Sequence, residues 1–393
     1  MSITYKWINS IDNIEKSDWI KLYENKSILK SFEFTNAVEK SKLEGTKFYY
    51  LLVFKDNVID SILQCYSYKV KLEILAGNSI KKIANLIRII YPKFLQTKLF
   101  VIGSPIATCE NHVSINYNNL SFKKTIFNLL IDKSKDLKTS LIIVKEIPNS
   151  ELKPFEDYFS KIKFFESLPN SFIPISRDSF PYPNMLRKRY RQRFKSAIKK
   201  SDADGYKWEF VTNYSSMVHE MYNLYLNVYE KSEYKFEKLT PTFFERVQKT
   251  LPKKSFLLTC RNSFGNLICA ELIMEGENEL IPMYLGLDYT FTRNNNIYNN
   301  VIFRTILEAE KRNKNWVLLG QTSYKAKAYS GAIFEKLYLG VYSHRPLMKF
   351  FINHFFKFLF PKFLKPNVNN INNEIKTKNC FTELILESGK KFE

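Results

Sequence analysis

The sequence predicts an α/β protein built from two modules, and three observations lead to this prediction. The chain has 393 residues, 45% of them apolar, which is enough for two domains with full hydrophobic cores. The spacing of apolar residues gives the element order β-β-β-α-β once in each half of the chain. Prolines 169, 174, 181 and 183 lie among short extended pieces between the two, and they indicate a crossover.

The first module is expected to open with a hairpin, because two apolar runs flank Lys55-Asp56-Asn57, where Asp and Asn tolerate tight-turn geometry. Its expected elements are strands at 48–54, 58–66 and 99–102, a helix near 122–138 and a strand at 141–146. The second module should contain strands at 255–260, 267–274 and 280–287, a helix near 297–312 and a strand at 316–319.

A duplication and a chance match of element order both explain this similarity, because residue identity between the halves is low. We place the boundary near residue 165. The predicted organisation is a first module at 1–165, a second module at 166–345, and an amphipathic helix followed by a polar tail at 346–393.

The composition and the spacing of Gly, Cys and His argue against several classes of function. Lys and Arg outnumber Asp and Glu by 21, which favours anionic partners. The 11 glycines are too widely spaced for a dinucleotide or P-loop fingerprint. The five cysteines form no C-x-x-C pair and the four histidines are isolated, so we expect buried thiols, a reducing cytoplasmic compartment and no metal site.

A basic helix is predicted at 186–200, where eight Lys and Arg side chains, Arg189 and Arg193 among them, occur without one acid. Leu186, Tyr190 and Phe194 form its apolar face. The helix is either a solvated surface face or a surface that binds phosphates, because like charges at this density repel unless anions neutralise them.

Two strand ends carry clustered polar residues. After the strand ending near Asp288 and Tyr289, Asn294, Asn295 and Asn296 are natural N-caps for the helix that follows, and its free N–H groups can hold a pyrophosphate beside Tyr298 and Asn299. After the strand 316–319 comes Gly320-Gln321-Thr322-Ser323-Tyr324, with Lys327 close behind. Ligands in open α/β sheets bind beyond strand ends, so a site is expected here. A Ser-based triad is not supported, because Ser323 lacks the nucleophile-elbow motif.

Several of these segments together resemble a known family. They are Asn227–Ser232, Lys235–Thr240, Gly286–Tyr289, Gly320–Tyr324 with Lys327, Gly331-Ala332 and His344–Leu347. Their order and spacing are similar to those of predicted N-acyltransferases related to the FemAB peptidoglycan aminoacyltransferases and kindred acetyltransferases, within the GNAT superfamily. The resemblance implies two tandem GNAT-like modules, with the transfer site in the second. The glycine-containing loop with which GNAT enzymes hold acyl-CoA is absent after Asp288, so the donor is either acyl-CoA or an aminoacyl-tRNA.

The resemblance implies direct transfer of an acyl or aminoacyl group to an amine, on a cell-envelope precursor or a lipid, with no permanently bound cofactor. We expect Tyr324 to act as general acid, Gln321 and Lys327 to orient the reactants or stabilise charge, and Asp288 or Glu230 to take the acceptor's proton. The residues expected to bind the donor are Tyr289, Asn296, Tyr298, Asn299, Arg189 and Arg193. A non-catalytic RNA- or polyanion-binding protein on the same fold is the alternative, and no sequence-specific DNA-binding module is present.

The segment 346–364 is predicted to form a helix with a wide aromatic stripe and a narrow polar one. It either docks on the second module or a dimer partner, or attaches peripherally to the inner face of the plasma membrane, where lysines would meet anionic headgroups and lipid-linked acceptors would be within reach.

Overall fold

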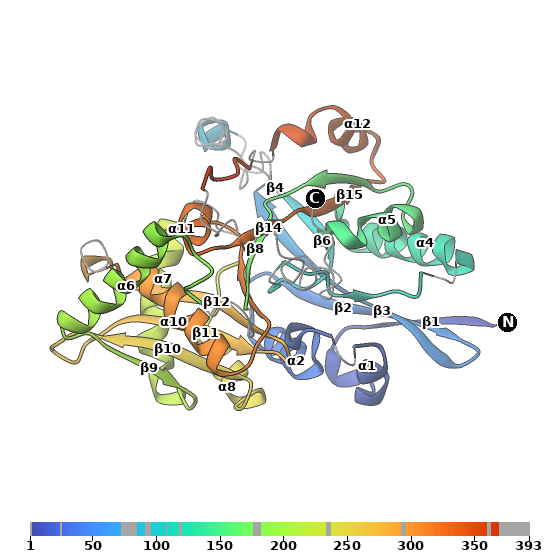
Figure 1. Ribbon diagram of the computed structural model, residues 1–393. Helices are drawn as coiled ribbons and strands as arrows, with labels where there is room; N and C mark the ends of the chain where they lie inside the picture. Colours follow the sequence, from blue (N-terminus) through green and yellow to red (C-terminus); the bar gives the residue numbers. More distant parts are fainter. Residues whose placement is uncertain are drawn as a thin grey trace. The chain divides into compact units, whose positions relative to one another are not determined.

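The computed structural model divides the chain into two compact units (Figure 1). Unit 1 comprises Met1–Leu168, Tyr234–Leu239 and Lys336–Phe363, and unit 2 comprises Pro169–Glu233, Thr240–Glu335 and Leu364–Glu393. The structure describes residues 2–23, 26–71, 85–90, 96–107, 109–117, 120–175, 182–232, 237–291, 296–359 and 363–368. The expected polar tail from residue 369, and Asn294 and Asn295, lie outside these ranges.

Unit 1 is built on a mixed sheet whose strands run in the order β1-β2-β3-β4-β6-β15-β7, with β5 paired to β3. The strands are β1 (Ile3–Ile8), β2 (Lys47–Lys55), β3 (Val58–Lys71), β4 (Gln96–Ile102), β5 (Val113–Ser114), β6 (Leu141–Pro148), β7 (Lys163–Glu166) and β15 (Leu337–Tyr342). The parallel pair is β4 and β6, while the other pairs are antiparallel. The predicted hairpin and the strands at 99–102 and 141–146 therefore lie in this sheet.

Helices cover both faces of the first sheet (Figure 1). On one face lie α1 (Lys16–Tyr23) and α2 (Phe32–Lys40); on the other lie α4 (Leu120–Asp136) and α5 (Asn149–Tyr158). The alternation of β2 explains the two layers, because Tyr49 and Leu51 join the core under α4 and α5 while Tyr50 contacts Trp19 of α1. Short 3₁₀ turns at Ile11–Asn13 and Ile28–Lys30 flank α1, and α12 (Pro346–His354) with a final turn at Phe356–Leu359 follows β15.

Unit 2 repeats the arrangement with the strand order β9-β10-β11-β12-β13-β8-β14. The strands are β8 (Asn170–Pro174), β9 (Lys207–Val211), β10 (Ser255–Arg261), β11 (Leu267–Glu275), β12 (Glu279–Leu287), β13 (Trp316–Gly320) and β14 (Ile333–Glu335). The helices are α6 (Lys188–Ala203), α7 (Val218–Lys231) after a 3₁₀ turn at Ser215–Met217, α8 (Pro241–Thr250), α10 (Ile297–Lys311) and α11 (Tyr324–Tyr329).

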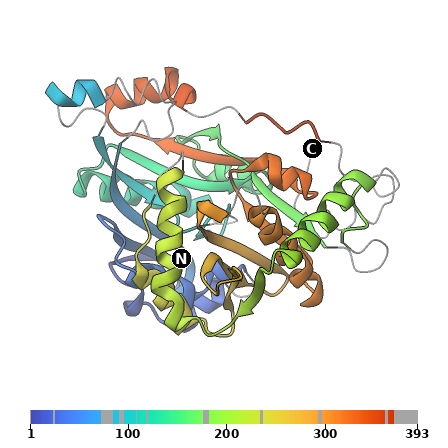
Figure 2. The same cartoon turned by 90° about the vertical axis from the view of Figure 1, so that its left-hand side faces the viewer.

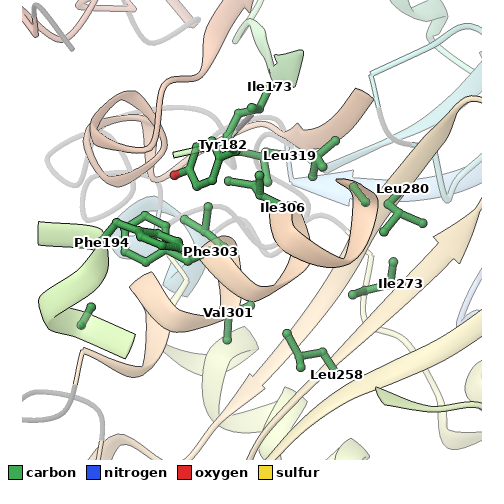
Figure 3. Packing of buried hydrophobic residues seen from close by; sticks show 14 of the residues in the cluster. Ile173, Tyr182, Phe194, Leu258, Ile273, Leu280, Val301, Phe303, Ile306 and Leu319 are labelled. Atoms are coloured by element: carbon green, nitrogen blue, oxygen red, sulfur yellow. The ribbon is translucent and has the colours of Figure 1, made fainter. Parts of the chain in front are cut away.

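The core of unit 2 joins α6 and α10 to one face of the sheet (Figure 3). Phe194 of α6 packs edge-on against Phe303 of α10, with ring centroids 4.8 Å apart. On the opposite face α7 lies so close to β12 that a Cβ at Gly286 would come within 2.6 Å of Leu224 Cβ. Glycine is therefore the residue that fits at this strand–helix contact.

Each sheet takes its sixth strand from the other half of the chain. β8 follows β7 in sequence but pairs between β13 and β14 of the second sheet, and β15 follows β14 but pairs between β6 and β7 of the first. The fold is thus the expected pair of mixed sheets flanked by helices. It differs from the expected division at 336–345, because β15 is a strand of the first sheet, and the predicted helix at 346–364 ends at His354.

The exchange predicts that the stability of β6 and β7 depends on β15, although β15 is far from both in the sequence. Val341 of β15 is buried in unit 1, so Val341→Ala should lower the free energy of unfolding by about 1–3 kcal/mol through the cavity it leaves. Hydrogen exchange should accelerate in Leu141–Pro148 and Lys163–Glu166. If it accelerates in the sequence-adjacent β13 and β14 instead, the strand order is wrong.

Candidate active site

The two parallel strands of unit 2 pair over only two residues. Glu279 pairs with Trp316 and Leu280 with Val317. Beyond that point the ladder of β12 with β11 continues to Leu287, while β13 stays paired with β8 on its other side. A register shift between Leu272 and Ile273 adds one residue, Met283, to β12 in this stretch. Main-chain groups of β12 on the side of β13 are therefore outside the sheet ladder, as a strand-like ligand would require.

A buried carboxyl group lies beside this divergence. Glu271 of β11 is only 8% exposed, and Thr305 of α10 donates a hydrogen bond of 3.2 Å to its Oε2. Burial raises the pKa of Glu271 to about 8, against the smaller opposing effects of Thr305 and the Lys327 cation. A carboxyl group poised near neutral pH can act as a general base.

Tyr298, in the first turn of α10, shares this environment. Burial raises the pKa of its phenol to about 12, and the negative charge of Glu271 acts in the same direction. The Ser323 hydroxyl hydrogen-bonds the phenol and opposes the rise. Tyr298, which the sequence placed with the donor-binding residues, thus lies with Glu271 and Ser323 in one electrostatically coupled group.

The turn that carries Ser323 has a rare backbone conformation. Gly320, Thr322 and Ser323 have φ of 69°, 63° and 49°, in the left-handed region that a β-branched Thr adopts seldom. Lys327 holds this turn in place: its buried ammonium donates to the carbonyl oxygens of Leu319, Gly320 and Gln321 at 2.6, 3.1 and 2.7 Å. Strained turns held this way cluster at functional sites.

The Lys327 ammonium therefore contacts the backbone carbonyl oxygen of Gln321. Lys327 has the position of a residue that orients the turn, because its three hydrogen bonds go to backbone oxygens. The Tyr324 hydroxyl points elsewhere: it donates to Pro169 O at 2.9 Å, and its ring packs edge-on against Phe334. The proton of Tyr324, expected to serve the leaving group, is committed to a backbone carbonyl.

The remaining expected proton acceptors lie toward α7. Asp288 accepts hydrogen bonds from Thr290 N at 2.9 Å and Thr290 Oγ1 at 2.7 Å, so its carboxylate caps the turn after β12. Glu230 is exposed on α7. The Lys231 ammonium lies 3.5 Å from the centroid of the Tyr289 ring, and burial raises the pKa of Tyr289.

The start of α10 brings Asn296 and Asn299 together. Asn296 adopts a left-handed conformation (φ 51°) as the N-cap residue, without a side-chain cap, and its Oδ1 accepts from Asn299 Nδ2 at 3.3 Å. Buried Asn300 donates to Ala197 O of α6 at 3.1 Å, which ties this helix start to the basic helix. The first turn of α10 contains no acid, as an anion-binding turn would require.

The basic helix α6 presents most of its charges outward. Arg189 and Arg193 are exposed. The Arg193 guanidinium lies 4.7 Å from the centroid of the Tyr329 ring in α11, and Tyr190 stacks on the same ring at 5.8 Å. These contacts and the bond from Asn300 place α6 against α10 and α11, the two helices that follow the diverging strands.

Sequence reasoning missed Glu271 and Thr305. Glu271 is the one acid inside the apolar run Leu267–Met274, and a buried acid in such a run is a signal that could have been used. Thr305 gave no signal, because its role depends on how α10 packs over β11.

Other structural features bear on the site class. A pocket of about 560 Å³ in unit 2 is lined by Thr212, Asn213, Ser215, Glu245, Gln248, Lys249 and Pro252, none of them a predicted site residue. Within the described ranges, no three His, Cys, Asp or Glu side chains gather as a metal site would need. The part of the chain that the structure describes has no helix both long and apolar enough to cross a membrane.

Comparison with solved structures shows which fold this is. FemX superposes with a TM-score of 0.55 at 12% identity, covering 85% of this chain and 96% of FemX. L-PGS from Bacillus licheniformis gives 0.51 at 13% identity, covering 88% and 97%. A tandem GNAT protein from the clavulanic acid biosynthesis pathway gives 0.51 at 7% identity, covering 88% and 99%. The chain therefore has the tandem GNAT fold of FemAB-like proteins.

Comparison by sequence adds no closer relative. No protein-family profile matches the chain, and no curated protein matches it. The fold is thus established by structure alone.

The buried Glu271 predicts a specific pH dependence of stability. Between about pH 4.5 and about pH 8 the folded state keeps a proton on Glu271 that the unfolded state has lost, so this residue makes stability fall as pH rises. The slope is up to about 1.4 kcal/mol per pH unit for one proton. Glu271→Gln should remove that component in chemical denaturation from pH 5 to 9, whereas Glu209→Gln, on exposed β9, should not. Identical slopes in wild type and Glu271→Gln would contradict the raised pKa.

Proposed function

We propose that this protein is an N-acyltransferase that moves an acyl or aminoacyl group from an activated donor to an amine, with the reaction at the divergence of β12 and β13. The observation that supports this most is that buried Glu271 acts electrostatically on Tyr298 beside the stretch of β12 that continues past its short ladder with β13. The FemAB-like fold agrees with group transfer of this kind. The cell-envelope or lipid nature of the acceptor, and work on the cytoplasmic side, belong to the same proposal.

In this mechanism the acceptor nitrogen attacks the donor carbonyl carbon, so a C–N bond forms and the C–O or C–S bond of the donor breaks. Ionised Glu271 takes the proton that the amine loses, and Tyr298 gives a proton to the leaving atom. Holding both reactants along β12 supplies much of the rate enhancement, on the order of 7 kcal/mol or more. No bond to the enzyme forms. We assign the proton transfers to these residues because Tyr324 and Asp288 are engaged elsewhere.

The pKa of Tyr298 bears on the choice of donor. A thiol has a pKa of about 8.5, so a thiolate leaves without needing a proton. The hydroxyl of an ester donor is a far weaker acid, and a phenol whose pKa is about 12 is well matched to protonate it. We therefore favour an aminoacyl ester, as on tRNA, over a CoA thioester. The exposed bases of α6 suit the phosphates of either donor.

Matched variants test the catalytic roles. With an aminoacyl-tRNA donor, Glu271→Gln and Tyr298→Phe should each lower kcat by about 10²–10⁴-fold. Tyr324→Phe, which removes a phenol hydroxyl 26 residues away in the same unit, should keep kcat within about threefold. With a thioester donor, Tyr298→Phe should cost much less.

The results for these variants distinguish an acyltransferase from a non-catalytic polyanion-binding protein. Loss of activity in Tyr324→Phe but not in Tyr298→Phe would reverse the assignment of the acid. RNA binding that weakens steeply with salt, with no transfer to any amine and no effect of either variant, would favour the non-catalytic polyanion-binding protein.

The basic helix predicts a separate effect on donor binding. Arg189→Gln should raise KM for a phosphate-bearing donor about two- to tenfold and leave kcat unchanged, because an exposed phosphate contact stabilises ground and transition states equally. Lys249→Gln, an exposed cation on α8, is the matched control. Equal KM values for the two variants would show that α6 is a solvated surface helix with no role in donor binding.

A further inference from the structure

Unit 1 exposes two apolar helices. In the helical turn 85–90, Leu86, Ile89 and Ile90 are 65%, 78% and 90% exposed. In α12, Leu347 and Phe350 are 87% and 58% exposed, and Phe355 and Phe358 just after it are 49% and 69% exposed. Figures 1 and 2 both draw the light blue turn and α12 at the same end of unit 1. Figure 1 draws the two helices apart, so each has its own exposed apolar face, and such faces mark interaction surfaces.

The other side of α12 is firmly anchored to the first sheet. Ile352 and Phe356 are buried, and the Phe356 ring lies 5.3 Å from that of Phe165 in β7. Lys163 of β7 donates to Asn353 O at 3.0 Å. Because the helix is already docked through this side, its exposed Leu and Phe side chains form an outward face that the described part of unit 1 leaves uncovered.

Both helices lie in stretches of sequence without acids. From Ile74 to Cys109 and from Lys336 to Asn373 the sequence contains no Asp or Glu, although it contains 39 of them elsewhere. Arg345, Lys349 and Lys357 are exposed around the aromatic face of α12. The surface formed by the two helices therefore exposes apolar side chains, has a basic rim around α12, and contains no acid in its own stretches of sequence.

We infer that this surface docks on an anionic lipid bilayer. Phe, Leu and Ile would enter the acyl boundary while Lys and Arg meet the anionic headgroups, which attract each base. A second copy is a poor occupant, because a symmetric contact would bring two basic rims together. The inference goes beyond the proposed transfer and does not depend on it.

Vesicle flotation with the full chain tests the inference. At low salt the protein should float with vesicles of phosphatidylglycerol and phosphatidylcholine, and not with phosphatidylcholine alone. Ile89→Ser with Ile90→Ser, and separately Phe350→Ser with Phe358→Ser, should each lower the partition coefficient at least about tenfold. Phe264→Ser, an equally exposed aromatic on the β10–β11 turn of unit 2, is the matched control and should float like wild type.

The contrary outcomes are equally definite. Wild type that fails to float, or apolar variants that float like Phe264→Ser, would overturn the inference. So would a wild-type dimer in sedimentation that Phe350→Ser with Phe358→Ser converts to a monomer, since a second copy would then cover the surface. Flotation that appears only after removal of 369–393 would show that the chain covers its own surface. Because flotation needs no donor or acceptor, its result is separate from that of the transfer assay.

Discussion

The exchange of two strands is the constraint on which the rest of this structure depends. β8 completes the second sheet and β15 completes the first, so each sheet needs a strand from the other half of the chain. Without β15, the edge of β6 opposite β4 would be open, and β7 would lose its partner. Open edges and unpaired strands are unstable and prone to aggregate. The two modules are therefore expected to fold interdependently, although each has its own core.

The same topology distinguishes unit 2, in which we propose the site, from unit 1. In unit 1 the parallel strands β4 and β6 pair over four residues, from Leu99 with Leu141 to Ile102 with Val144. In unit 2 the equivalent strands pair over two, and the extra residue Met283 lies in β12 past the end of that ladder. The shorter ladder leaves β12 after Leu280 outside the ladder with β13. The buried carboxyl of Glu271 and the phenol of Tyr298 then give that place its chemistry.

Much of the fold could be predicted from periodicity, because apolar alternation and helix spacing are local properties. The strands at 255–260 and 267–274 were placed within a residue of their observed ends, and the helix near 297–312 was placed equally well. Strand partners are not local, so nothing in the sequence near Leu337–Tyr342 revealed that this strand joins the first sheet. A six-residue apolar strand is compatible with either sheet.

The polar turn after β13 could be predicted from the sequence, whereas the contacts of the candidate side chains could not. Polar residues after a buried strand predicted a site at 318–327, and the structure places there a turn that carries Ser323 and is held by Lys327. The choice between Tyr298 and Tyr324 depends on side-chain direction, which follows from packing: Pro169 O takes the Tyr324 proton. Glu271 was hidden because alternation alone gives no reason for an acid inside a core strand.

The central claim is that donor and acceptor meet along β12 beside Glu271. Hydrogen exchange of backbone amides, measured with and without a non-reactive analogue of an aminoacyl-tRNA end, tests it most directly. The account predicts added protection at Met283–Leu285 and at Ser323, where the donor would pair with β12 and face the turn after β13. Protection confined to the pocket lined by Thr212, Gln248 and Pro252, with Met283–Leu285 unchanged, would contradict it.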